Sequence, residues 1–142
     1  MMKTMIKILI VVFAFSLTYY ANAQEPKSVN VDKMNNIKHV EFTKKDLKKI
    51  YFLATYNFYN DKFGEALPIF QKLLKNDPAN SNLRYYIGVC YYHTKNYNAS
   101  KEYLTIASKN TSENYKDSVF EKNAPRQVFS YLKLIENIEL KN

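Results

Sequence analysis

The chain has 142 residues, and its 21 lysines and arginines outnumber 13 acidic residues, which gives a formal net charge of +8. A single cysteine rules out an internal disulfide, and two histidines and two glycines argue against a metal centre and a glycine-rich phosphate loop. The length is that of one domain.

The first 23 residues have the pattern of an export signal. Lys3 and Lys7 precede an apolar run over residues 8–17, and Ala-Asn-Ala at 21–23 has the form of a signal-peptidase site. The apolar run over residues 8–17 is shorter than the roughly 18 residues that a membrane span needs. The alternative to a cleaved signal peptide is an uncleaved membrane anchor. Cleavage after residue 23 of 142 would leave 119 residues, and losing two lysines would lower the charge from +8 to +6. We therefore expect an exported protein.

The region 24–42 is polar and without periodicity, so we expect a flexible leader there and a helical domain over 43–142. Thr43 followed by Asp46 is typical of a helix N-terminus, because the hydroxyl can accept from a first-turn amide. From Asp46 to Tyr59, apolar residues recur at spacings of three and four, which predicts the first helix.

Four further helices are predicted in order. One runs from about Phe63 to Leu74 and is ended by Pro78, one is capped by Asn80 or Ser81, and one begins at Tyr97. Residues 108–122 break the pattern, with at best one or two helical turns over 114–122. A last helix follows Pro125. No segment alternates strictly enough to predict a strand, so the fold class is all-α.

In the last helix, we expect one face to be inward and the other to be solvated. The inward residues are Phe129, Leu132 and Ile135, and the outward ones are Lys133, Glu136 and Asn137.

The helical segment repeats itself at one constant lag, without a gap. Size class and order are kept in seven pairs: Tyr51 with Tyr85, Leu53 with Ile87, Ala54 with Gly88, Phe58 with Tyr92, Phe63 with Tyr97, Ala66 with Ser100, and Phe70 with Leu104. A repeated helical hairpin is more often a binding scaffold than an enzyme.

These residues resemble the tetratricopeptide repeat, a pattern of about 34 residues that has Leu-Gly-x2-Tyr, then Ala-x3-Phe, then Pro. The matching positions are Leu53, Ala54, Ala66, Phe70 and Pro78 in the first unit, and Ile87, Gly88, Tyr91, Ser100 and Leu104 in the second. Asn57, Arg84 and Ser112 depart from the pattern. The resemblance covers about residues 44–112. It implies antiparallel helical hairpins, about 2.5 units stacked as a short right-handed solenoid, with a C-terminal capping helix.

Two small residues fit this interpretation. Glycine inside a helix costs about 1 kcal/mol relative to alanine, so Gly88 is expected at a close helix crossing. Cys90 is expected to fill the core rather than to react.

Repeats of this family bind extended peptides on the concave face, which the first helix of each hairpin lines. The resemblance places ten residues there: Lys48, Tyr51, Thr55, Phe58, Tyr59, Asn82, Tyr85, Val89, Tyr92 and His93. Tyrosine suits peptide recognition because it offers a large contact area and a polar tip. The alternative is that some of these rings pack on the neighbouring hairpin. Relatives that clamp a C-terminal carboxylate use Lys and Asn where this chain has Tyr51 and Thr55, so a charged-tail ligand is not expected.

A looser resemblance concerns the whole chain. The signal pattern, two repeats, Tyr115-Lys116-Asp117 and a further helix after Ala124-Pro125 are similar to the N-terminal part of certain Gram-negative envelope proteins that are linked to type IX secretion. Those proteins continue into an OmpA-like domain that grips peptidoglycan, a property that is not carried over. The chain could be a truncated or a stand-alone relative. The resemblance implies the periplasm or the outer envelope.

The function expected from the sequence is a non-enzymatic scaffold that docks envelope proteins or peptide segments, with no cofactor and no metal. Self-association through the C-terminal helix is a further possibility. The rival is a basic adaptor that contacts anionic lipid or polysaccharide through Lys44, Lys45, Lys48 and Lys49. Because export argues against nucleic acid, we expect no nucleic-acid partner.

Overall fold

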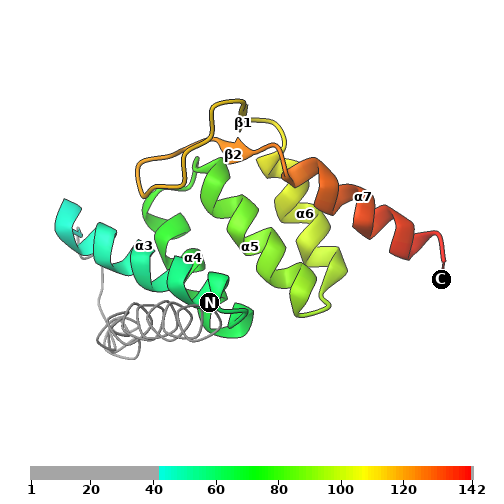
Figure 1. The fold of residues 1–142 in the computed structure, drawn as a ribbon, viewed down its shortest axis with the longest axis horizontal. Helices are drawn as coiled ribbons and strands as arrows, with labels where there is room; N and C mark the ends of the chain where they lie inside the picture. Colours follow the sequence, from blue (N-terminus) through cyan, green and yellow to red (C-terminus); the bar gives the residue numbers. More distant parts are fainter. Residues whose placement is uncertain (1–41, 142) are drawn as a thin grey trace, which may run out of the picture. The chain divides into compact units, whose positions relative to one another are not determined.

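The computed structural model describes residues 42–141, which lie within one compact unit. The predicted signal peptide and nearly all of the predicted leader fall outside the described residues. Five helices make up this part: α3 (Lys44–Tyr59), α4 (Phe63–Asn76), α5 (Ser81–His93), α6 (Tyr97–Ala107) and α7 (Val128–Glu139). Figure 1 shows consecutive helices packed side by side as antiparallel hairpins. The predicted all-α repeat architecture is confirmed.

Polar side chains fix where two helices begin. The Thr43 hydroxyl accepts a hydrogen bond from the Asp46 backbone N–H at 3.2 Å and donates to the Asp46 carboxylate at 2.6 Å. The Asn80 side chain accepts from the Leu83 N–H at 3.0 Å, which identifies Asn80 rather than Ser81 as the cap of α5. The predicted starts of α3 and α5 are therefore confirmed.

The two hairpin turns have the same backbone geometry and occupy equivalent positions in the two repeats. Asp61 and Lys95 adopt positive φ angles of 59° and 64° just past the ends of α3 and α5. The next amides, of Lys62 and Asn96, each bond back to a carbonyl five residues earlier, both at 2.9 Å. This is the Schellman arrangement, which satisfies the last helical carbonyls.

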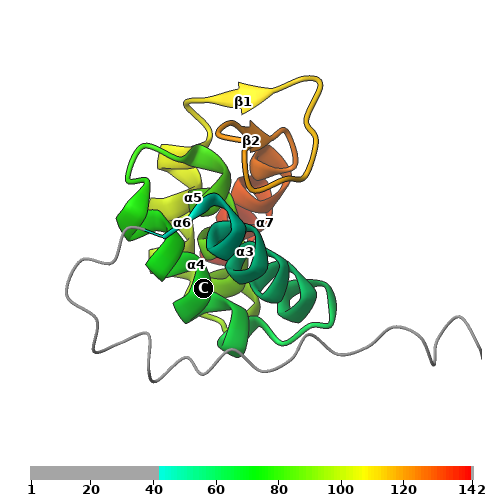
Figure 2. The ribbon, with the colours of Figure 1, turned by 90° about the vertical axis from the view of Figure 1, so that its left-hand side faces the viewer.

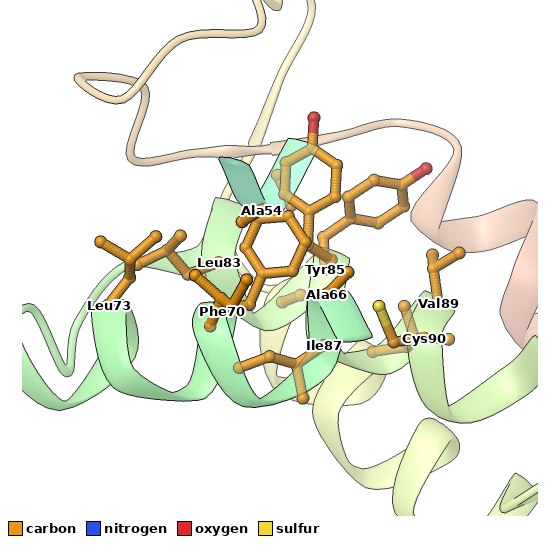
Figure 3. Packing of buried hydrophobic residues seen from close by; sticks show 14 of the residues in the cluster. Ala54, Ala66, Phe70, Leu73, Leu83, Tyr85, Ile87, Val89 and Cys90 are labelled. Carbon is orange, nitrogen blue, oxygen red and sulfur yellow. The ribbon is translucent and has the colours of Figure 1, made fainter. Parts of the chain in front are cut away.

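The core lies between the hairpins. Ala54, Ala66, Phe70 and Ile87 have no exposed surface, and Figure 3 shows them gathered in one cluster. Small residues let the helices approach, and Phe70 fills the space between them by stacking on the Tyr86 ring at 4.6 Å.

Gly88 lies at a close crossing of α5 and α6, as expected. A Cβ on this glycine would lie 2.6 Å from Cγ of Leu104. The Ser100 hydroxyl crosses the same gap and donates to the Gly88 carbonyl at 2.7 Å.

The repeat is interrupted between α6 and α7. The connection between α4 and α5 is residues 77–80, whereas the connection between α6 and α7 is residues 108–127. Figures 1 and 2 show the connection 108–127 running back past the N-terminal end of α5 toward α3. Its Lys122 carbonyl accepts from the N–H groups of Ser81 and Asn82 at 2.9 and 3.1 Å, so it caps α5.

One prediction about this connection needs correction. It contains two short parallel strands, β1 (Thr111–Ser112) and β2 (Ala124–Pro125), where no strand was predicted. The two strands meet because the backbone of the connection folds back on itself, and the Ala124 N–H donates to the Asn110 carbonyl at 2.8 Å. Strands of two residues are too short to show an alternation of apolar and polar side chains in the sequence. Residues 114–122 contain hydrogen-bonded turns but no helix, which is within the predicted limit of one or two helical turns.

One position of helix α7 differs from the prediction: Ile135 and Leu132 pack inward and Lys133, Glu136 and Asn137 are exposed, as expected, but Phe129 is not inward. Val128 and Ile135 are fully buried, whereas Phe129, which was expected to face inward, is 47% exposed. Val128 and Ile135 are seven residues apart, so they lie on one side of the helix, and Phe129, one residue after Val128, is turned away from that side.

Candidate partner-binding face

Aromatic side chains of α5 and α7, the first helices of successive units, meet a ring at the start of α4. His93 at the end of α5 stacks on the Phe63 ring with a centroid distance of 3.9 Å and an angle of 4°. Tyr131 of α7 lies 5.2 Å from the Tyr92 ring, and its hydroxyl lies 3.5 Å from Nε2 of His93. We call Phe63, Tyr92, His93 and Tyr131 the aromatic cluster.

The aromatic cluster keeps surface that a partner could contact. His93 is exposed and the other three side chains are half-buried. Partial burial lowers the pKa of His93, against the opposing pull of Asp61, so its ring favours the neutral form. A neutral, stacked imidazole beside tyrosine hydroxyls suits contacts with apolar and hydrogen-bonding groups.

A second set of side chains forms a connected hydroxyl network around one carboxylate. The Asp117 carboxylate accepts hydrogen bonds from the hydroxyls of Tyr51 and Tyr59, the latter at 2.9 Å. The Tyr115 hydroxyl donates to Oδ1 of Asn82 at 2.9 Å, and the Asn82 amide donates to the Tyr51 hydroxyl at 3.2 Å. The hydroxyl of Tyr86 lies 3.2 Å from that of Tyr59 and 3.4 Å from that of Tyr115. We call these six residues the hydroxyl network.

The phenols of the hydroxyl network stay protonated. Burial raises the pKa of Tyr51 well above its ordinary value, and the adjacent Asp117 carboxylate raises it further. Burial is also the main cause of the raised pKa values of Tyr86 and Tyr115. The phenols therefore remain hydrogen-bond donors at physiological pH.

The ten sequence-predicted site residues divide by exposure. Five are buried: Tyr51, Thr55, Asn82, Tyr85 and Val89. Phe58 and Tyr92 are half-buried, and Lys48, Tyr59 and His93 are exposed. Tyr51, Tyr59 and Asn82 meet in the hydroxyl network, Tyr92 and His93 meet in the aromatic cluster, and Val89, with no exposed surface, is part of the core. Their role in partner binding stays a prediction.

Five residues of these sites were not among the ten predicted ones: Phe63, Tyr86, Tyr115, Asp117 and Tyr131. Phe63 begins α4 and Tyr86 lies on α5, outside the positions that the resemblance marks. Tyr115 and Asp117 lie where the repeat breaks, and Tyr131 lies on a helix that begins later than the repeat period would place it. The available signal was the Tyr115-Lys116-Asp117 segment inside the connection 108–127, which we call the insertion.

A cleft of about 450 Å³ lies beside the hydroxyl network, between the start of α3 and the connection 108–127. Its lining includes Phe42, Leu47, Leu83 and Val119. At its edge, Lys122 Nζ and the Asp77 carboxylate form an ion pair at 2.6 Å. The pair ties the insertion to the end of α4.

Cys90, the single cysteine of the chain, is buried. Burial raises the pKa of the Cys90 thiol to about 12, which keeps it protonated and a poor nucleophile. Among residues 42–141, no three histidines, cysteines or carboxylates gather as metal ligands would. Within the same described range, no helix is both long and apolar enough to cross a membrane.

Comparison with known proteins gives one match. Residues 58–117 match a family model described as tetratricopeptide repeat, which spans the end of α3, all of α4 to α6 and part of the insertion. No curated protein and no solved structure matches. The tetratricopeptide repeat is a fold that mediates protein–protein interaction. The match, the equivalent hairpin turns and the packing of α3 to α7 together support a repeat protein of the tetratricopeptide type.

Proposed function

We propose that this protein is a non-enzymatic scaffold of the bacterial cell envelope that docks a segment of a partner protein on the face formed by α3, α5 and α7. The observation that carries the proposal is the aromatic cluster, because residues from two first helices and the start of α4 converge there and keep exposed surface. The envelope location rests on the export-signal pattern of residues 1–23.

The chemistry of the cluster fits an extended peptide better than a charged surface. Aromatic rings bury large areas, and their polar edges can bond to peptide groups. Such contacts depend little on ionic strength, since screening weakens interactions between charges at distances beyond about 8 Å at physiological salt.

The test is capture of partners from a detergent extract of the bacterial envelope, by the tagged protein and by a His93→Ala/Tyr131→Ala variant. The variant should lose partners that the wild-type protein retains at low and at high salt. Tyr103→Ala is the matched control, because Tyr103 contacts the Tyr91 ring of α5 from α6, away from the cluster. Retention of every partner by the double variant, with unchanged thermal unfolding, would contradict docking at the cluster.

The rival function is binding to an anionic lipid surface. Lys44, Lys45, Lys48 and Lys49 are all exposed at the start of α3. Binding to phosphatidylglycerol vesicles that is strong at low salt, steeply weakened at high salt and lost when these lysines are changed to Gln would favour the rival.

A further inference from the structure

We propose that the hydroxyl network is a carboxylate-binding site, that the chain's own Asp117 fills it in cis, and that a partner segment occupies it by displacing residues 113–120. The ligand class is a peptide with an aromatic residue two positions before an Asp or Glu. The proposal rests on the proposed function and specifies which partner segment the face selects.

The donors belong to the helices, and the acceptor belongs to the insertion. Tyr51 and Tyr59 come from α3 and Asn82 from α5, whereas Asp117 comes from a segment that is far from α3 along the chain. The helical repeats thus contribute a preformed pair of phenol donors and a buried amide. Bonds of phenols to a carboxylate are charge-assisted and therefore stronger than bonds between neutral groups.

The insertion covers and satisfies the polar groups of the site. Asn82 has no exposed surface and Tyr51 is 7% exposed while Tyr115 and Asp117 bond to them. If the insertion left, both side chains would have to exchange these bonds for bonds to water or to an incoming segment. A segment that reproduces the bonds supplies a carboxylate for the two phenols and a polar group, such as a phenol, for Asn82.

Side chains, not backbone, hold the middle of the insertion. Its ends are fixed by the pairing of β1 with β2 and by the Lys122 carbonyl on α5. Between residues 113 and 120, the backbone makes hydrogen bonds only within the insertion, among the bonds of the described residues. Attachment there comes from Tyr115, Asp117, half-buried Val119, and Phe120, whose ring lies 5.4 Å from Lys48 Nζ.

This construction allows exchange. Breaking the bonds of Tyr115 and Asp117 and the contacts of Val119 and Phe120 frees a short segment without unpairing its anchored ends. A competing peptide that makes the same bonds can replace it once its concentration or additional contacts offset the advantage of the tethered segment, which is the arrangement of a reversible internal ligand. The face would admit a matching segment and exclude one that lacks the carboxylate.

The probe is a fluorescein-labelled peptide copying residues 112–120, added to the full chain. A Tyr115→Ala/Asp117→Ala variant, which vacates the site, should bind it at least ten-fold more tightly than the wild-type chain. Lys116→Ala is the control, since the side chain of Lys116 is exposed and lies between the two bonded residues. A peptide with Asn in place of its Asp should bind the vacated variant at least ten-fold less tightly. Equal binding to both chains, or equal binding of both peptides, would overturn the proposal.

A milder pair of variants covers the case in which the double variant does not fold. Asp117→Asn and Tyr59→Phe should each speed tryptic cleavage after the exposed Lys116 several-fold. Tyr56→Phe is the matched control, because that hydroxyl lies on the same helix but outside the hydroxyl network. Unchanged cleavage rates would show that the carboxylate does not hold the insertion.

The outcomes separate this proposal from the proposed function. If envelope partners are lost on changing His93 and Tyr131 but the peptide copy binds no vacated chain, the face docks partners without a carboxylate. If the peptide binds but no partner depends on the aromatic cluster, the site exists and the scaffold proposal fails.

Discussion

Gly88 shows how strongly a single position can be constrained. Its missing side chain faces Leu104, which is fully buried and cannot move toward solvent. Gly88→Ala should therefore lower the free energy of unfolding by about 1–2 kcal/mol, because overpacking outweighs the gain of about 1 kcal/mol in helix propensity. Urea unfolding followed by circular dichroism measures the difference.

Gly64 is the control that separates packing from propensity. It also lies in a helix, but nothing is within 4 Å of the place where its Cβ would be. Gly64→Ala should leave stability unchanged or raise it by up to about 1 kcal/mol. If both alanine variants are equally stable, Leu104 relaxes and the crossing is looser than its geometry indicates.

Tyr51 and Tyr85 show what residue spacing can and cannot predict. Their spacing correctly placed them on the face of the first helices, but both are at least nine-tenths buried. The covering groups are Asp117 and Tyr115 over Tyr51, and Tyr131 over Tyr85. The periodicity of a sequence identifies which residues share a helical face. It does not show whether residues that are distant in the sequence bury that face.

At the scale of elements, the helices were predictable and the insertion was not. Caps such as Thr43 and Asn80 are local, so the sequence around them suffices. The turns at Asp61 and Lys95 lack the expected glycine, yet they are separated by one repeat period, which marks them as equivalent. The path of residues 108–127 depends on single long-range bonds, which no local pattern encodes.

The ion pair between Asp77 and Lys122 is the bond that holds the insertion to α4 most directly. Asp77→Asn should lower the thermal midpoint by a few degrees, because a partly exposed pair contributes up to about 1 kcal/mol. Glu113→Gln is the control: Glu113 pairs with Arg126, but its side chain is 82% exposed, so we expect no measurable change. Thermal unfolding at neutral pH compares the variants.

The same pair gives a pH dependence with a defined sign. Burial alone would raise the pKa of Asp77, but hydrogen bonds from Lys122 and Asn80 outweigh it and hold the pKa below its ordinary value of 3.8. The stabilisation is therefore complete above about pH 4–5 and is lost as the pH falls through the folded-state pKa. The gap in midpoint between wild type and Asp77→Asn should close in strong acid. A gap that persists there would mean that the carboxylate charge does not provide the stabilisation.

At the scale of the whole molecule, the insertion and α7 cover the surfaces of α3, α5 and α6 that a further repeat would otherwise bury. Two complete hairpins leave one side of α5 and α6 uncovered, and about three units are usually needed to bury a continuous core. Here α7 covers that side with Val128 and Ile135, while the insertion covers the first helices with Tyr115 and Asp117. Stability and access to the face are thereby coupled through one segment of chain.

Deleting residues 124–142 tests this coupling. The deletion removes Val128 and Ile135, whose burial contributes about 3–6 kcal/mol together, a large part of the roughly 5–15 kcal/mol that stabilises a typical domain. It also removes β2, which anchors the insertion. We expect loss of cooperative unfolding and aggregation, detected by circular dichroism and light scattering.

Phe129→Ser and Leu140→Ser are the matched controls, because Phe129 on α7 and Leu140 just past its end are 47% and 80% exposed. Each should change stability by less than about 1 kcal/mol. If the deleted chain stays monomeric and unfolds cooperatively, α7 is not a required cap. If either control has a lower mass by light scattering than the wild-type chain, the wild-type chain self-associates through this exposed surface. A residue that is exposed in one copy would then be buried by a second copy.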